Sequence, residues 1–188
     1  MSTAEPGVTP VTTPARVGWI LTVTLVNLGT FVAFFGPIAV LLPMQSEALR
    51  PHSKEATLAL ITGLGAAISL VANPLFGAFS DRTTSRRGRR VPWITIGTLG
   101  GALGLSILAG ATQLWHVILG WCLVQAAVNA SLAAITATLP DRVPVEQRAT
   151  AGGMVSLGQT LGILVGAGLA IAFGGYRAGY AACAVFLV

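Results

Sequence analysis

The sequence predicts an all-α polytopic membrane protein. Of its 188 residues, 54% are hydrophobic and only 9% are charged, and the mean hydropathy is +0.78. A water-soluble domain carries about 25% charged residues. The apolar residues also gather in long runs, and a helix needs about 20 such residues to cross the hydrocarbon core of a bilayer. The composition is therefore typical of a protein embedded in a lipid bilayer.

The chain is expected to begin with a tail followed by a membrane helix. Residues 1–16 contain three prolines and few apolar side chains, which predicts a disordered tail. The first apolar run, 17–42, is longer than the apolar region of a secretory signal and is expected to remain uncleaved. Pro37 within this run lacks a backbone N–H and should kink the helix.

Four more runs are long enough to span a bilayer, and they are expected at 56–79, 91–112, 115–139 and 144–173. A sixth run, 178–188, is apolar but covers only eleven residues, which cannot cross a bilayer. We therefore expect this last helix to be incomplete and the coding sequence to continue. Residues 17–188 then form one transmembrane bundle.

The positive residues are distributed unevenly between the connections. Eleven Lys and Arg outnumber six Asp and Glu, which gives a formal net charge of +5. Three of the eleven lie on one set of alternate connections, and the other eight are Arg16, Arg82, Arg86, Arg87, Arg89, Arg90, Arg142 and Arg148. The positive-inside rule then places the N-terminus in the cytoplasm, and we expect a bacterial cytoplasmic membrane. Because five of these arginines share one short loop between two spans, they are interpreted as topology determinants, and no nucleic-acid partner is expected.

The most specific motif joins the second and third expected spans and reads NPLFGAFSDRTTSRRGRRVPW from Asn73 to Trp93. The residues that define it are Gly77, Asp81, Arg82, Arg87, Gly88, Arg89 and Arg90. This loop resembles the cytoplasmic signature of the major facilitator superfamily. Its longer form is similar to that of the sugar:cation symporters of the glycoside–pentoside–hexuronide group and the sucrose carriers. The resemblance implies the N-terminal six-helix half of a major facilitator fold, built from two inverted three-helix repeats, with a second six-helix half beyond Val188.

The acid of this motif is expected to need a positive partner. Asp81 lies at the carboxyl end of the second expected helix, where exposed carbonyl groups disfavour negative charge. The loop arginines or the amide end of another helix could supply the partner, and the resemblance implies a helix of the second half. We expect Asp81, Arg82 and Arg87 to Arg90 to form a cytoplasmic charge cluster that latches one conformation. The alternative is a set of solvated topology charges.

The second short loop, PDRVPVEQR, resembles the corresponding loop of the same superfamily. Asp141, Arg142 and Arg148 are therefore added to the expected gating set, and plain helix capping is an equal alternative. We also expect Gly77 to allow the close approach of a neighbouring backbone. The glycines that repeat every four residues in the fifth expected span predict close helix packing: Gly158, Gly162 and Gly166.

Polar side chains within the expected spans are the candidates for solute binding. On a helical projection Asn27, Phe31 and Phe34 share one face, which combines an amide with aromatic rings and suits a sugar. Gln125 and Asn129 share a stripe on the fourth span, and Thr62, Ser69 and Asn73 share one on the second. The resemblance places the first and fourth helices at the central cavity. The substrate candidates are Asn27, Phe31, Phe34, Gln125, Asn129 and Gln159. Hydrogen bonding between helices uses the same residue types and is the alternative.

These observations predict a secondary active or facilitative transporter of a small solute, favouring a sugar or glycoside, that works by alternating access. The alternatives are a drug or small-molecule exporter of the same superfamily and a truncated, non-transporting membrane protein. No nucleotide-binding, HExxH or GxSxG motif is present, so no enzyme, metal or cofactor is expected. The interiors of the expected spans contain no Asp, Glu, Lys or Arg, which leaves coupling to H⁺ or Na⁺ open.

Overall fold

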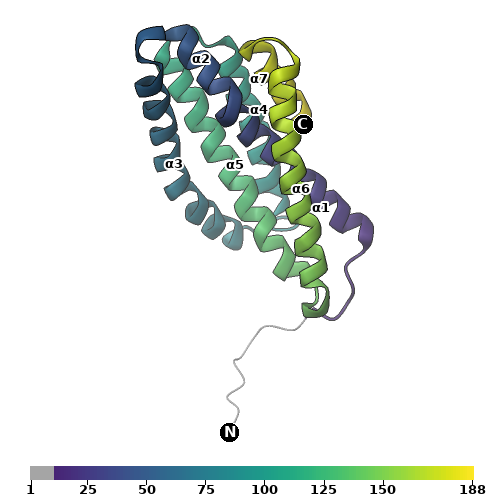
Figure 1. Ribbon diagram of the computed structural model, residues 1–188. Helices are drawn as coiled ribbons and strands as arrows, with labels where there is room; N and C mark the ends of the chain where they lie inside the picture. Colours follow the sequence, from purple (N-terminus) through teal and green to yellow (C-terminus); the bar gives the residue numbers. More distant parts are fainter. Residues whose placement is uncertain (1–10) are drawn as a thin grey trace.

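The computed structural model describes residues 11–188, and within that range the chain folds into helices without any strand (Figure 1). Residues 1–10 of the expected tail lie outside the described residues, and residues 11–16 have irregular backbone. The helical elements are α1 (Val17–Gly36), η1 (Pro37–Leu41), α2 (Leu42–Leu49), η2 (Pro51–Ser53), α3 (Lys54–Arg82), α4 (Val91–Gly110), α5 (Leu114–Arg142), α6 (Val145–Ala172) and α7 (Tyr176–Leu187).

Within residues 11–188, five helical segments are long and apolar enough to cross a membrane: Val17–Leu49, Pro51–Arg82, Val91–Gly110, Leu114–Arg142 and Val145–Ala172. The long helices run alternately up and down the bundle (Figure 1). Many large apolar side chains on their outer faces are exposed, as Leu70, Leu103 and Leu164 illustrate. A bilayer solvates such faces, whereas water does not. The chain is a multi-pass integral membrane protein.

Several helices extend beyond the apolar runs that predicted them, whereas α4 ends at Gly110 rather than at 112. The first run was expected to end at residue 42, but the helical path continues through η1 and α2 to Leu49. Likewise α3 ends at Arg82 rather than at 79, and α5 ends at Arg142 rather than at 139. An apolar run measures the thickness of the hydrocarbon layer, and a helix can continue past it into the polar interface.

Prolines shape the helices in two ways. The distortion expected at Pro37 is confirmed, since η1 is a π-helical turn that begins at this residue. In contrast, α3 continues through Pro74 as one helix. Pro144 was expected to be the first helical residue of the fifth span, but it is the N-cap, and α6 begins at Val145. Its extended backbone, with ψ of 154°, keeps it outside the helix.

The main helix contacts reveal two related three-helix units, α1–α3–α4 and α5–α6–α7. Helix α1 packs on α6 just as α5 packs on α3, and α4 packs on α5 just as α7 packs on α1. When α1, α3 and α4 are exchanged with α5, α6 and α7 in that order, each of these contacts becomes another contact of the same set. Because α1 and α5 run in opposite directions, the units are related by inversion (Figure 1). The predicted half of a major facilitator fold with inverted repeats is therefore confirmed.

Glycines bring α6 close to α1. A Cβ atom built on Gly158 would lie 2.5 Å from the carbonyl oxygen of Thr24, and one on Gly162 would lie 2.5 Å from that of Leu28. A Cβ on Gly166 would lie 3.0 Å from the carbonyl oxygen of Val32. No side chain fits at these distances. The close packing predicted for this glycine repeat is confirmed.

Helix α5 is the centre of the bundle. In its most apolar window 67% of the residues are buried, compared with 17% in the segment that contains α3. The side chain of Trp121 is fully buried and stacks on Phe34 of α1, with ring centroids 6.0 Å apart. Polar groups on α5 must therefore find partners on neighbouring helices, which determines where the candidate site lies.

Candidate functional site

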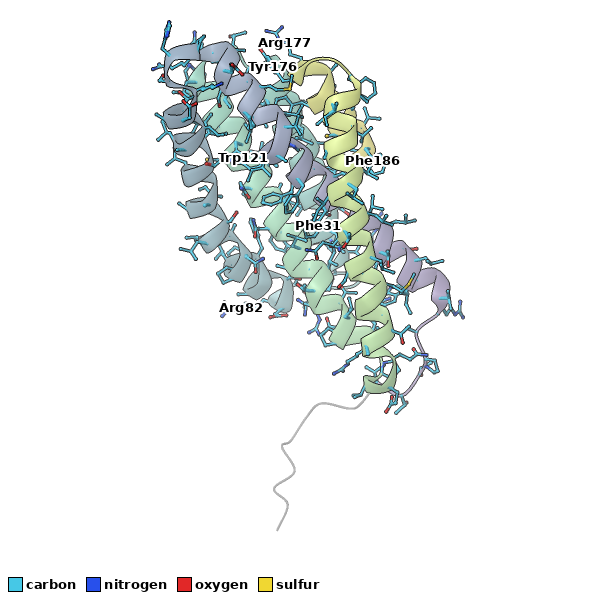
Figure 2. The ribbon with its side chains drawn as sticks, viewed as in Figure 1. Phe31, Arg82, Trp121, Tyr176, Arg177 and Phe186 are labelled. Atoms are coloured by element: carbon cyan, nitrogen blue, oxygen red, sulfur yellow. The ribbon has the colours of Figure 1, made fainter. Side chains whose placement is uncertain are left out.

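A cavity of about 470 Å³ lies between four helices of the bundle. Its lining comprises Asn27, Phe31, Asn73, Leu132, Ile135, Thr136, Leu139, Gly152, Val155, Ser156 and Gln159. Phe31 lies between the two ends of the bundle, which are marked by Arg82 and Arg177 (Figure 2). The lining combines three amides, two hydroxyls and one aromatic ring, and none of its residues is charged. Such a surface suits a small, neutral, polar ligand.

Asn27 of α1 lines this cavity and also forms a hydrogen bond with α6. Its side chain is almost fully buried, and Nδ2 donates a hydrogen bond of 2.9 Å to the carbonyl oxygen of Val155 in α6. This bond uses one of the two N–H groups of the amide, which leaves the other N–H group and Oδ1 for a ligand. The helix contact expected as the alternative is therefore made, by a side chain that also lines the cavity.

The two phenylalanines of the predicted face have different surroundings. Phe31 lines the cavity and stacks on Phe35, with ring centroids 5.7 Å apart. Phe34 does not line the cavity, because its ring packs against Trp121 in the core. On α6, Gln159 is exposed and lines the cavity as expected. The structure therefore brings Asn27, Phe31 and Gln159 together.

Gln125 and Asn129 lie behind the cavity wall rather than in it. Both are buried, and both face α3. Ser69 Oγ donates to Gln125 Oε1 at 2.7 Å, and Asn129 Nδ2 donates to Ser69 Oγ at 2.9 Å. Asn73, a cavity residue outside the predicted set, donates from Nδ2 to Asn129 Oδ1 at 3.3 Å. The polar stripe predicted on the second span had indicated Ser69 and Asn73. Both residues form hydrogen bonds with α5.

A charge cluster lies at the end of the bundle that carries Arg82. The guanidinium of Arg90 contacts two carboxylates, with Nη1 2.7 Å from Asp81 Oδ1 and Nε 2.8 Å from Asp141 Oδ2. Nη1 also donates to Ser80 Oγ at 3.1 Å, and Arg89 Nη2 lies 2.8 Å from Asp141 Oδ1. Burial of Arg90 opposes its charge, but the hydrogen bonds to the two carboxylates outweigh this effect and raise the pKa of the guanidinium. This cluster joins α3, α4 and α5.

The remaining residues of the predicted gating set lie around this cluster. Arg82 and Arg87 are exposed and form no ion pair within residues 11–188. Arg148 donates to the carbonyl oxygens of Val143 and Pro140, at 3.1 and 3.2 Å, and thus caps the end of α5. This is the capping role that the sequence left open.

Two glycines of the motif differ in their surroundings. Gly88 has φ of +93°, which side chains rarely adopt, and it lies beside the guanidinium of Arg142. It therefore turns the loop toward α5. A Cβ built on Gly77 would meet no atom within 4 Å among the described residues. The close backbone approach expected at Gly77 is not made within this part of the chain.

Comparison with known proteins identifies related sequences. A sequence model described as Major Facilitator Superfamily matches residues 21–188. Proton-associated sugar transporter A of Mus musculus and that of Rattus norvegicus are each 40% identical over 62 residues, which is 33% of this chain and 8% of theirs. The Homo sapiens protein of the same name is 51% identical over 41 residues, 22% of this chain and 6% of its own. The matched segments therefore span 8% or less of these curated relatives.

Proposed function

The chain belongs to the Major Facilitator Superfamily, and we propose that it serves as the N-terminal half of a transporter that moves a sugar or glycoside across the membrane by alternating access. In this mechanism two halves rock against each other around a site near the middle of the bilayer. The cavity beside Phe31 is this half's contribution to that site. The proposal is transport rather than catalysis, and it involves no cofactor.

The uncharged, amide-rich lining of the cavity is the observation that carries the proposal. Amides and hydroxyls can pair with the many hydroxyl groups of a sugar, and the ring of Phe31 can pack on its apolar C–H face. A purely apolar drug would leave these polar groups without partners, which costs free energy. The names of the relatives, sugar transporters, agree with this preference.

We propose that a second six-helix half covers α3. Only 17% of the most apolar window of this segment is buried, and on it Asn73 is exposed and Gly77 is half-buried. An amide that faces lipid is costly, so a protein surface or a water-filled cavity is the more favourable neighbour. The missing side chain of Gly77 would then allow the second half to approach closely.

We propose that the charged end of the bundle faces the cytoplasm. Arg82 lies at this end, and Arg177 lies at the opposite end (Figure 2). Eight of the eleven positive residues belong to the connections on the Arg82 side. This imbalance favours a cytoplasmic location for that side and for the N-terminus.

The test is solute uptake by the full-length native protein reconstituted in proteoliposomes. Radiolabelled hexoses, disaccharides and aryl glycosides are compared with a lipophilic cationic drug, with and without a gradient of H⁺ or Na⁺. We expect saturable uptake of at least one saccharide, and stimulation by one gradient would identify a coupling ion. Transport of the drug alone would favour the exporter, and transport of no solute would favour the non-transporting protein.

A further inference from the structure

A chain of hydrogen bonds connects four uncharged side chains between α3 and α5. It runs from Gln125 through Ser69 and Asn129 to Asn73, with donor–acceptor distances of 2.7, 2.9 and 3.3 Å. Gln125 and Asn129 are 3% and 9% exposed, whereas Asn73 is exposed and lines the cavity. One end of the chain is therefore buried in the bundle, and the other end reaches the site.

A backbone carbonyl fixes the direction of this chain. Nδ2 of Asn129 also donates to the backbone oxygen of Gln125, at 2.8 Å. Because a carbonyl oxygen can only accept, the NH₂ group of Asn129 must face it, and Oδ1 must face the opposite side. That oxygen meets Asn73, which must then present its own NH₂ group. The opposite orientation of Asn129 would place two acceptors against each other at the Gln125 oxygen and two NH₂ groups against each other at Asn73.

The carboxamide oxygen of Asn73 is consequently left for the cavity. No donor within residues 11–188 forms a hydrogen bond with Asn73 Oδ1. Inside a membrane protein such an acceptor needs a partner, because burial without a hydrogen bond is costly. A hydroxyl group can donate to it, whereas a second acceptor cannot.

We infer that Asn73 binds the solute as a hydrogen-bond acceptor for one hydroxyl group, and that Asn129, held by Ser69 and the backbone oxygen of Gln125, is the positioning residue that fixes this orientation. The inference rests on the proposed sugar transport. It assigns a solute contact to α3, and it gives Gln125 and Asn129 an indirect role behind the cavity wall. A freely rotating Asn73 could offer either its oxygen or its NH₂ group to the solute. The fixed orientation offers only the oxygen, so the site selects solutes that present a hydrogen-bond donor at this position.

The selectivity can be measured with analogues of glucose in which single hydroxyl groups are replaced by hydrogen or fluorine. Neither replacement can donate a hydrogen bond, so a site that requires a donor discriminates against both. In the full-length protein, we expect one ring position at which both analogues compete for glucose uptake about tenfold more weakly than glucose does. Asn73→Ala should remove the discrimination at that position and retain it at the others.

The positioning role requires a second set of variants. Asn129→Ala does not alter the cavity lining, yet it should also reduce the discrimination, because Asn73 then rotates freely. Thr136→Val alters a cavity residue that does not belong to the chain, so it should weaken binding and keep the discrimination. Ser69→Ala is paired with Ser106→Ala, an exposed serine on α4 that bonds only to its own helix. Only Ser69→Ala should reduce the discrimination.

Each outcome decides between the two proposals. If the wild-type protein transports glucose and the discrimination survives in Asn73→Ala or in Asn129→Ala, the inference is wrong and sugar transport stands. If the wild-type protein transports neither glucose nor any other saccharide, the proposed function fails and the inference fails with it. Asn129→Ser, which is too short to reach Asn73, replaces Asn129→Ala if that variant does not reach the membrane. Lower thermal stability of the Asn129 variants with unchanged discrimination shows a purely structural role and overturns the inference.

Discussion

Arg90 Nη1 lies 2.7 Å from Asp81 Oδ1, so the residue that precedes α4 is paired with the last turn of α3. The same guanidinium contacts Asp141 in the last turn of α5. Both acids lie at helix carboxyl ends, where the exposed carbonyl groups disfavour negative charge. Arg90 compensates both of them, and it is one of the loop arginines that the sequence left open as partners of Asp81. Any rearrangement of these helix ends must break or move this bridge.

The two acids of the bridge should respond differently to neutralisation. The Asp81 side chain is 61% exposed and has one arginine partner, whereas Asp141 is 22% exposed and has two. Asp81→Asn should cost less than about 1 kcal/mol of stability, as for exposed pairs. Asp141→Asn should cost about 1–3 kcal/mol, because Arg90 is then left partly buried with weaker compensation. Thermal unfolding in detergent gives the comparison, and Glu47→Gln in the exposed Lys54 pair is the control.

Asp81→Asn should also slow transport more than it lowers stability. If the bridge to Arg90 stabilises one conformation by about 1 kcal/mol, its loss shifts the conformational equilibrium roughly fivefold. Initial rates of solute uptake, normalised to the amount of folded protein, measure this effect. A wild-type rate for Asp81→Asn would remove the latch role and leave the cluster as a set of topology charges.

The contact between α1 and α6 should not tolerate a single methyl group. A Cβ atom on Gly158 would lie 2.5 Å from the backbone oxygen of Thr24, so Gly158→Ala forces the two helices apart. We expect a loss of about 1–3 kcal/mol, the usual cost of overpacking. Gly168→Ala on the same helix meets no atom within 4 Å and should be neutral or slightly stabilising. Equal melting temperatures of the two variants would contradict the proposed contact.

A buried network at the opposite end should be sensitive to the loss of Gln45. Its Nε2 donates to the carbonyl oxygens of Leu108 and Ala111 at the end of α4, at 3.1 and 3.5 Å, and its Oε1 accepts from Tyr180 at 2.9 Å. Gln45→Leu leaves both carbonyls and the tyrosine hydroxyl without this partner, whereas Tyr180→Phe removes only one bond. Gln45→Leu should therefore lower the free energy of unfolding by about 1–3 kcal/mol more than Tyr180→Phe does. Unfolding in detergent ranks the two variants, and a larger effect of Tyr180→Phe would be the contrary result.

Apolar length predicted the order and number of the spanning helices, because the hydrocarbon layer imposes a minimum length on every span. It could not predict which neighbour each polar stripe faces. Gln125 and Asn129 share a stripe, as the projection indicated, but the rotation of α5 turns this stripe toward α3. Asn73, which bonds to Asn129 on this stripe, lines the cavity from α3. Such rotations depend on packing between distant segments, which helical periodicity does not contain.

The loop motif illustrates a second limit of prediction from sequence. The motif left open whether a loop arginine or the amide end of another helix would compensate Asp81, and it could not show which arginines turn inward. The positive φ of Gly88 and the capping position of Arg90 direct the last two arginines toward α5, while Arg82 and Arg87 stay exposed. A single backbone turn thus separates bridging arginines from solvated ones. The carboxylate that Arg90 contacts belongs to Asp141, 51 positions further along the chain, so the local motif does not contain this partner.

The membrane orientation can be tested with two single cysteines at opposite ends of α3. Thr84 follows α3 in the charged loop, Ser53 precedes it in η2, and both are exposed. In a background with Cys122 and Cys183 replaced by alanine, a membrane-impermeant maleimide should label Ser53→Cys in intact cells. Thr84→Cys should react only after permeabilisation, because the arginine-rich connections are retained in the cytoplasm. Labelling of Thr84→Cys alone in intact cells would reverse the orientation and place the Arg90 bridge outside the cell. Since neither substitution removes a charged residue, the result reports the native charge distribution.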